Sequence, residues 1–271
     1  MRKLLIFDFD GTVIDGHMHS HFCSLYKSDY NSGRNDAVTE QDVESFLQSS
    51  GGIKNKEKLS CMLKSALNSE NVEVAIASFT RYPKAVKLII QKHLGLSEGQ
   101  AQKIRIVGST GKELEDVRER EHTIKPFLEQ RDIGKNLHIF YHTLRYKSKY
   151  YISPQEVMLV DDDEDNIKVL SNIHEHPSYL LRGQYYISEV LIDPDTVDWT
   201  QGYDDDVFTT DIGKEELRSI KFKGVFVPSK TANQSTSCDY LDEVEKFISP
   251  ATMLEEVRDE PAVKKQRTNI T

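Results

Sequence analysis

Short hydrophobic segments alternate with amphipathic segments over residues 1–183. Most of the hydrophobic segments are continuous, which is typical of parallel strands covered on both faces. The predicted strands span residues 3–8, 72–78, 103–109, 156–162 and 178–183. Apolar residues at helical spacing predict helices between them, at residues 84–95, 135–151 and 164–173. This order predicts an α/β fold, with an open, doubly wound and mainly parallel sheet.

Two regions depart from this alternation. Residues 16–70 are mostly helical in pattern, which predicts either a long crossover helix or a small helical insertion. Beyond residue 183 the pattern weakens, and the expected elements are two further strands and one helix, at 185–193, 220–228 and 239–248. We therefore expect a core over residues 1–183 and a partly helical C-terminal extension over 184–271, with a flexible tail.

The net charge and the cysteines of the chain indicate which kinds of partner and cellular compartment to expect. The chain has 271 residues and a formal net charge of -9, which argues against a nucleic-acid partner. Its three cysteines, Cys23, Cys61 and Cys238, form no CxxC pair, which fits a reducing compartment. The first apolar run is too short for a signal peptide, and no run is long enough to span a membrane. We expect a cytoplasmic protein, and the sequence leaves its oligomeric state open.

Acidic residues stand at the ends of two predicted strands. The segment "LLIFDFDGT" places Asp8 and Asp10 directly after the first strand, and alternation would point both the same way. Two adjacent carboxylates repel each other, so a cation, a shared proton or solvent must compensate for them. A simpler reading is a polar strand end with an Asp-Gly turn. However, ligands of doubly wound sheets bind beyond the carboxyl ends of the strands.

An apolar strand followed by D-x-D-G-T resembles the first motif of the haloacid dehalogenase superfamily of Asp-dependent phosphatases. The resemblance implies that Asp8 is the nucleophile and forms an aspartyl-phosphate intermediate. It implies that Asp10 is the general acid and then the general base, which are roles that suit carboxylates. Gly11 and Thr12 would bind the substrate phosphate. The fold that it implies is the doubly wound sheet predicted above.

The segment "VMLVDDDEDN" resembles the family motif that holds a metal ion. The resemblance implies that Asp162 binds Mg²⁺ together with Asp8 and the backbone carbonyl of Asp10. Asp161 and Asn166 would support these ligands. A few carboxylate oxygens plus a substrate phosphate are a ligand set that suits Mg²⁺. The simpler reading is a helix that begins with several acids because they stabilise the helix dipole.

Two further family motifs concern the phosphate group. Ser78, at the end of the strand "VAIAS", would hold the phosphate through its hydroxyl. The family's lysine, which neutralises the nucleophile and the phosphate, is matched to Lys135 before the helix at 135–151. Lys147 and Lys149 in the same helix are the alternatives. Arg81 is either a substrate contact or a solvated loop residue.

Other catalytic arrangements are less well supported. His17 and His21 have the spacing of some zinc pairs, with His19 between them, but no H-E-x-x-H motif is present, and a polar loop is the simpler reading. No cysteine is followed by arginine six positions later, as a cysteine-based phosphatase requires. No phosphate-binding P-loop motif occurs either.

The small room for a cap domain bears on the substrate. The segment between Asp10 and Ser78 holds a small helical insertion at most, so the site should be open to a macromolecule. The resemblance is therefore to capless or minimally capped phosphatases that act on phosphoproteins, including phosphotyrosine. We expect a cleft for such a ring to be lined by the aromatic residues beside the motif loops: Phe22, Tyr26, Phe79 and Tyr82. The alternatives are a small-metabolite phosphatase, a phosphotransferase and a non-catalytic binding module.

The end of the chain offers one further hint. The acidic segment 254–260 precedes a short polar end. Such ends resemble the secretion signals of effectors that intracellular bacteria deliver into host cells, and an exposed charged helix is the other reading.

Overall fold

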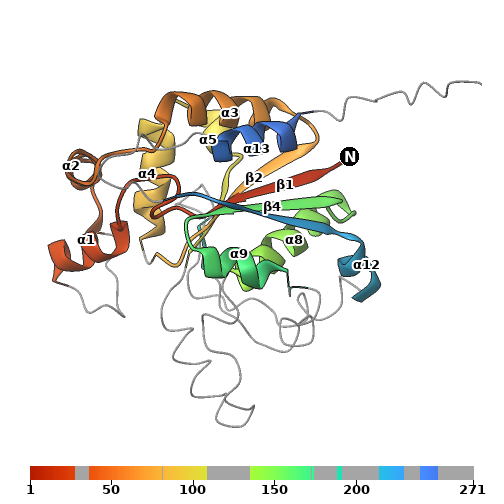
Figure 1. The fold of residues 1–271 in the computed structure, drawn as a ribbon. Helices are drawn as coiled ribbons and strands as arrows, with labels where there is room; N and C mark the ends of the chain where they lie inside the picture. The colour runs from red at the N-terminus through yellow and green to blue at the C-terminus, as the bar shows by residue number, and fades with distance from the viewer. Residues whose placement is uncertain are drawn as a thin grey trace, which may run out of the picture.

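The computed structural model describes residues 1–27, 37–80, 82–108, 135–171, 173, 188–190, 214–228 and 239–249. A six-stranded sheet lies between two layers of helices (Figure 1). The strands are β1 (Lys3–Phe7), β2 (Val72–Ala77), β3 (Arg105–Gly108), β4 (Glu156–Asp161), β5 (Ser188–Val190) and β6 (Lys221–Phe226). Their order in the sheet is β5-β3-β2-β1-β4-β6. This architecture confirms the fold class expected from the sequence.

The connections place a switch in strand order beside β1. From β1 the chain continues to β2 and β3 on one side, and later returns to β4 and β6 on the other. These five strands run parallel, whereas β5 pairs antiparallel with β3 at the edge. Ligands of doubly wound sheets bind at the carboxyl ends of strands on either side of such a switch. In this chain those strands are β1 and β4.

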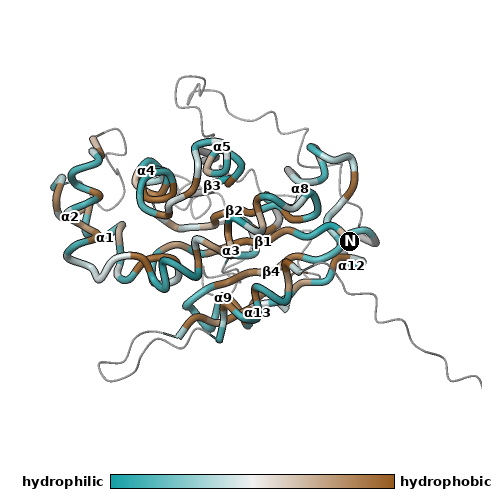
Figure 2. The backbone as a smooth tube through the Cα atoms, turned by 90° about the horizontal axis from the view of Figure 1, so that it is seen from above, coloured by the Kyte–Doolittle hydropathy of each residue, from teal (hydrophilic) through white to brown (hydrophobic). Residues whose placement is uncertain are grey.

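The helices cover both faces of the sheet. They are α1 (Met18–Tyr26), α2 (Glu40–Ser50), α3 (Lys56–Asn68), α4 (Pro83–His93), α5 (Glu98–Ala101), α8 (Asn136–Tyr150), α9 (Glu164–Leu170), α12 (Lys214–Ser219) and α13 (Asp239–Ile248). Leu5 and Phe7 face one layer, with α3, α4 and α13, while Leu4 and Ile6 face the other, with α8 and α9. The hydrophobic colour follows the central strands in Figure 2. No helix in these described ranges is long and apolar enough to cross a membrane.

The segment 16–70 contains both structures that its pattern allowed. Helix α3 is the crossover helix, because its buried stripe (Leu59, Met62, Leu63, Ala66 and Leu67) packs towards β2. Helices α1 and α2 are additional and lie at the end of the molecule towards which β1 points (Figure 1). They form a small helical addition at the carboxyl end of the sheet, where a site is expected.

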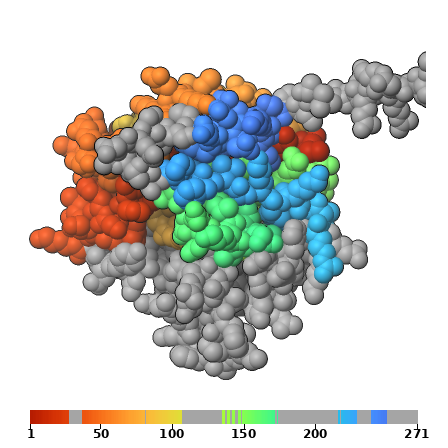
Figure 3. All heavy atoms as spheres, in the orientation of Figure 1, coloured from red at the N-terminus to blue at the C-terminus, as the bar shows by residue number. Residues whose placement is uncertain are grey.

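The division expected at residue 183 has to be corrected. β6 pairs with β4 over its full length, and Leu241 and Val244 of α13 are fully buried in the main core. In Figure 3, α13, β6 and α9 form one continuous face. A strand is expected at 220–228, but its pattern does not show that it belongs to the main sheet, because β6 is an edge strand in which only Val225 is buried. The strand expected at 178–183 lies outside the described residues.

Candidate active site

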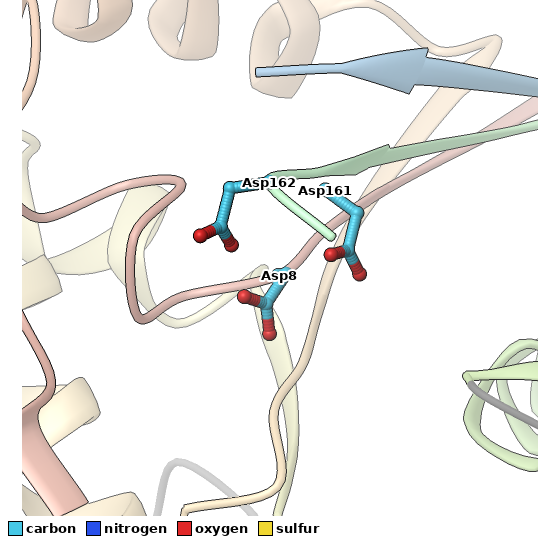
Figure 4. Close-up of side chains that lie close together, drawn as sticks. All are labelled: Asp8, Asp161 and Asp162. Carbon is cyan, nitrogen blue, oxygen red and sulfur yellow. The ribbon is translucent and has the colours of Figure 1, made fainter. Parts of the chain in front are cut away.

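Three aspartates meet where β1 and β4 end. Asp8 follows β1, Asp161 is the last residue of β4, and Asp162 comes next. The register pairs Phe7 with Val160, so Asp8 lies beside Asp161. One carboxylate oxygen from each aspartate lies within 4.8 Å of the others, and Figure 4 shows the three side chains together. This is an arrangement of oxygen ligands that a divalent cation can bind.

Lys135 provides a positive charge beside Asp8. It is the N-cap residue of α8, and its Nζ donates hydrogen bonds to Asp8 Oδ1 at 2.5 Å and to the Ala77 carbonyl at 2.9 Å. The ammonium also lies 4.1 Å from the ring centroid of Phe79. Only 2% of Lys135 is exposed, so its ion pair with Asp8 is shielded from water.

The alternative lysines lie elsewhere. Lys147 pairs with Glu216 at 2.7 Å, and Lys149 pairs with Glu73 at 3.6 Å. Lys135 is therefore the one of the three lysines considered that the structure places against Asp8. The start of α8 faces the end of β1, whereas its last turn lies towards the opposite end of the sheet.

Asp161 is held rigidly by uncharged donors. It is fully buried, and Asn166 donates its side-chain amide to both carboxylate oxygens at 3.1 Å. The backbone N–H of Asp163 adds a bond of 2.8 Å to Oδ1. Burial and the neighbouring charge of Asp8 raise the pKa of Asp161. Asn166 and the Asp163 backbone thus fix the orientation of the Asp161 carboxylate beside Asp8.

The turn after Asp10 packs closely on Asp162. Gly11 has φ of +76°, and a Cβ at this position would lie 2.1 Å from Asp162 Oδ2, so glycine is required here. Thr12 is buried and donates its hydroxyl to Asp162 Oδ1 at 3.1 Å. The structure thus shows Thr12 orienting an aspartate. Burial and Asp8 raise the pKa of Asp162.

Asp10 lies outside the group of three close carboxylates. Strand β1 ends at Phe7, so the alternation that would have aligned Asp10 with Asp8 stops before both residues. Asp10 Oδ2 accepts the backbone N–H of His19 at 3.4 Å, while Oδ1 is buried with no hydrogen-bond partner within the described residues. Burial and the charge of Asp8 raise the pKa of Asp10 to about 7. A carboxyl group with this pKa is suited to transferring protons near neutral pH.

Ser78 lies at the carboxyl end of β2, next to β1 in the sheet. Its side chain is buried, and its hydroxyl oxygen accepts the backbone N–H of Thr80 at 3.2 Å. The structure brings Ser78 to the same edge of the sheet as Asp8. Arg81, the other candidate in this loop, lies outside the described residues.

The histidines of α1 do not form a metal site with one another. His17 is exposed, whereas the His19 ring is buried and contacts Cys23 Sγ at 3.5 Å. Among the residues that the structure describes, the three aspartates are the only group of three or more potential ligands found close together. The zinc alternative therefore has no geometric support.

The expected aromatic cleft needs correction for two of its four members. Phe22 and Tyr82 are fully buried, and their ring centroids lie 5.4 Å apart in the packing between α1 and α4. They cannot contact a substrate in this arrangement. Tyr26 is half-buried and donates its hydroxyl to Asp42 at 2.8 Å. Phe79 is half-buried and lies against Lys135.

Sequence reasoning missed two buried side chains at this end of the sheet. Lys54 is 3% exposed, and its Nζ donates a hydrogen bond to the Gly11 carbonyl. The His138 ring is buried 5.1 Å from the ring of Phe79, and burial lowers its pKa. No local signal identified Lys54, because a lysine in a polar turn before a helix has the pattern of a surface residue.

Comparison with known proteins gives similarities at low sequence identity. No model of a known protein family matches the chain, and no curated protein matches it. Among solved structures, the HAD domain of the effector protein Lem4 from Legionella pneumophila (an inactive mutant) is 13% identical with a TM-score of 0.44, covering 90% of this chain and 92% of that one. The Legionella pneumophila effector Ceg4 is 16% identical with a TM-score of 0.40, covering 90% and 93%.

Proposed function

We propose that this protein is a phosphomonoester hydrolase that acts through an aspartyl-phosphate intermediate. The observation that carries the proposal is the buried contact between Lys135 and Asp8, beside Asp161 and Asp162. A carboxylate held against an ammonium stays ionised, as a nucleophile must be. The same ammonium lies where it can balance the charge of an incoming phosphoryl group.

Two carboxyl groups with different environments divide the chemistry. Asp8 attacks phosphorus, forming an oxygen–phosphorus bond while the bond to the leaving oxygen breaks, and Asp10 gives its proton to that oxygen. Asp10 then takes a proton from water, which attacks the phosphorus and releases Asp8 and inorganic phosphate. The raised pKa of Asp10 favours both proton transfers.

The acid group fits a bound Mg²⁺. The carboxylates of Asp8, Asp161 and Asp162 lie close together, and burial and the charge of Asp8 raise the pKa of Asp161 and of Asp162, so a cation between them would relieve the repulsion. Asp8 and Asp162 would hold the ion, with Asp161 as a support, and the bound ion would supply neutralisation of the phosphate charge. The residues of the chain, by contrast, orient the phosphate: Lys135 from one side and the Gly11 turn from the other.

The test of this proposal is a substitution that preserves shape. Asp8→Asn should reduce turnover of p-nitrophenyl phosphate by on the order of 10³-fold or more, because an amide cannot attack phosphorus. Wild-type protein quenched in acid during turnover should carry one phosphoryl group, detected by mass spectrometry, and Asp8→Asn should carry none. An Asp8→Asn variant with a tenth of wild-type turnover would rule out the covalent mechanism.

A phosphoprotein is the substrate class that we propose, with phosphotyrosine favoured. The support is the small size of the α1–α2 addition beside the site and the half-buried rings of Phe79 and Tyr26. We expect kcat/KM to be about tenfold higher for phosphotyrosine peptides than for matched phosphoserine peptides or hexose phosphates, in line with burial of one aromatic ring. Fastest turnover of a hexose phosphate would instead favour the small-metabolite alternative.

Delivery into a host cell is a separate proposal. It rests on the acidic segment 254–260 and the polar end after it, which lie outside the described residues. Fusion of a reporter to the chain should give reporter signal in infected cells, and removal of residues 250–271 should abolish it. Equal signal without these residues would contradict the proposal.

A further inference from the structure

We propose that Lys54 is a positioning residue that holds the turn at Asp10–Gly11 against Asp162 and thereby maintains the cation site. This inference rests on the proposed function for its effect on turnover, but its effect on cation binding can be measured without catalysis. Lys54 belongs to none of the motifs that the sequence analysis identified.

The two segments that Lys54 connects are paired along their backbones. Asp15 donates its N–H to the Gly52 carbonyl at 2.8 Å, and Lys54 donates its N–H to the Val13 carbonyl at 2.9 Å. Residue Ile14 forms an antiparallel bridge with Ile53 between these bonds. The segment before α3 therefore holds the turn after β1 in place through backbone hydrogen bonds.

The side chain of Lys54 extends this pairing to the site itself. Its Nζ donates to the Gly11 carbonyl and lies 4.0 Å from Asp15 Oδ1. Gly11 is the residue whose α-carbon packs directly on the Asp162 carboxylate. A shift of the Gly11 carbonyl therefore moves the surface against which Asp162 rests, and it also moves Asp10, which precedes Gly11.

Burial makes Lys54 costly unless it has a task. Only 3% of Lys54 is exposed, and removing an ammonium from water costs several kcal/mol. Replacing a whole buried ion pair by apolar residues is often neutral or stabilising, but removing one partner leaves the other uncompensated and is destabilising. Lys54→Met removes one partner, so a purely structural role predicts a lower Tm with an unchanged half-saturating Mg²⁺ concentration, whereas a positioning role also shifts that concentration.

The contacts of Lys54 include the carboxylate of Asp15 and the carbonyl of Gly11. Its ammonium group repels a bound cation, so loss of the charge alone should tighten Mg²⁺ binding. Weaker Mg²⁺ binding in Lys54→Met would therefore report the loss of geometry.

The experiment compares Lys54→Met, Lys54→Arg and the control Lys58→Met. Lys58 lies four residues further along, in α3, and pairs with Asp242 at the surface. Two quantities are measured against MgCl₂ concentration: the Tm and the turnover of p-nitrophenyl phosphate. We expect Lys54→Met to raise the half-saturating Mg²⁺ concentration in both titrations by on the order of tenfold, the range found for groups that orient metal ligands. For Lys54→Arg this concentration should stay within about threefold of the wild-type value, and for Lys58→Met it should equal the wild-type value.

The outcomes separate this proposal from the proposed function. Wild-type protein that Mg²⁺ stabilises but that hydrolyses no phosphomonoester would overturn the function, and the Tm titration would still test Lys54. Wild-type Mg²⁺ dependence in Lys54→Met, or no Mg²⁺ stabilisation of the wild type, would overturn the role of Lys54. If circular dichroism shows Lys54→Met unfolded, Lys54→Gln replaces it, because glutamine is too short to reach Gly11 and should show the same tenfold shift.

Discussion

The two ends of the sheet both bury charged side chains, but they balance them differently. At the amino end, Lys3 lies 3.9 Å from Glu156, and Glu73 pairs with Arg105 at 3.0 Å. Lys149 adds a second positive charge beside Glu73 at 3.6 Å. Positive and negative groups alternate across neighbouring strands, so the charges at this end neutralise one another and stabilise the fold.

At the carboxyl end, acids accumulate. Lys135 pairs with Asp8, whereas Asp161 and Asp162 accept hydrogen bonds from the uncharged groups of Asn166 and Thr12. Burial raises the pKa of Asp161 and of Asp162, and the nearby charge of Asp8 raises both further. Ion pairs between single residues are typical of structure, while a group of buried carboxylates with raised pKa values is typical of a functional site. The difference locates the candidate site independently of any motif.

The largest difference should appear between Lys135, the N-cap residue of α8, and Lys149, in its last turn. Lys135→Ala should reduce kcat for p-nitrophenyl phosphate by on the order of 10²–10³-fold, because it removes the cation that faces the nucleophile. Lys149→Ala should stay within about twofold, because its partner Glu73 lies at the other end. Steady-state kinetics at saturating Mg²⁺ checks both. Equal losses of kcat in the two variants would contradict the proposed difference between the two ends of the sheet.

Addition of Mg²⁺ should stabilise the protein only through the acids at the carboxyl end of the sheet. Mg²⁺ at about 100 times its dissociation constant should raise the free energy of unfolding by about 2.7 kcal/mol, and EDTA should abolish turnover. Asp162→Asn should lose most of this gain, and in EDTA it should melt at or above the wild-type Tm because one repelling charge is gone. A thermal melt with and without Mg²⁺ gives the answer. An undiminished Mg²⁺ response in Asp162→Asn would contradict the site.

The smallest effect should be a loss of stability without a loss of chemistry. Glu73→Gln should lower the free energy of unfolding by about 1.5–3 kcal/mol, the range for hydrogen bonds to charged groups. Its kcat and its response to Mg²⁺ should match wild type. Urea unfolding followed by circular dichroism measures the first quantity. A change in kcat beyond about threefold would mean that the charges of the amino end also serve the site.

The sequence was sufficient for the features that depend on local pattern. Continuous apolar strands predicted the parallel sheet, and their polar ends predicted that Asp8, Ser78 and Asp161 would meet at one edge. Contacts between residues that are far apart in the sequence were harder to predict. Lys135 caps the start of α8, whereas Lys147 and Lys149 lie in its last turn, and only the placement of α8 along the sheet shows which of them contacts Asp8.

Burial depends on partners that a one-dimensional pattern does not identify. Phe22 and Tyr82 are apolar beside the motif loops, but α1 and α4 pack them against each other rather than towards a ligand. Lys54 has the pattern of a surface residue, yet a carbonyl 43 residues earlier in the chain accepts its hydrogen bond. β6 escaped firm prediction because an edge strand needs few apolar residues.

The position of β6 has a consequence for synthesis of the protein. β4 lies between β1 and β6, so its outer backbone groups stay unpaired until residues 221–226 have been made. β6 follows β4 by roughly 65 residues, which at about 5–20 residues per second takes roughly 3–13 s. During this interval a nascent chain presents a strongly apolar strand with an open edge, the kind of surface that chaperones bind and that promotes aggregation. The candidate site, whose last acids are Asp161 and Asp162, therefore exists in the nascent chain before the strand that closes its sheet.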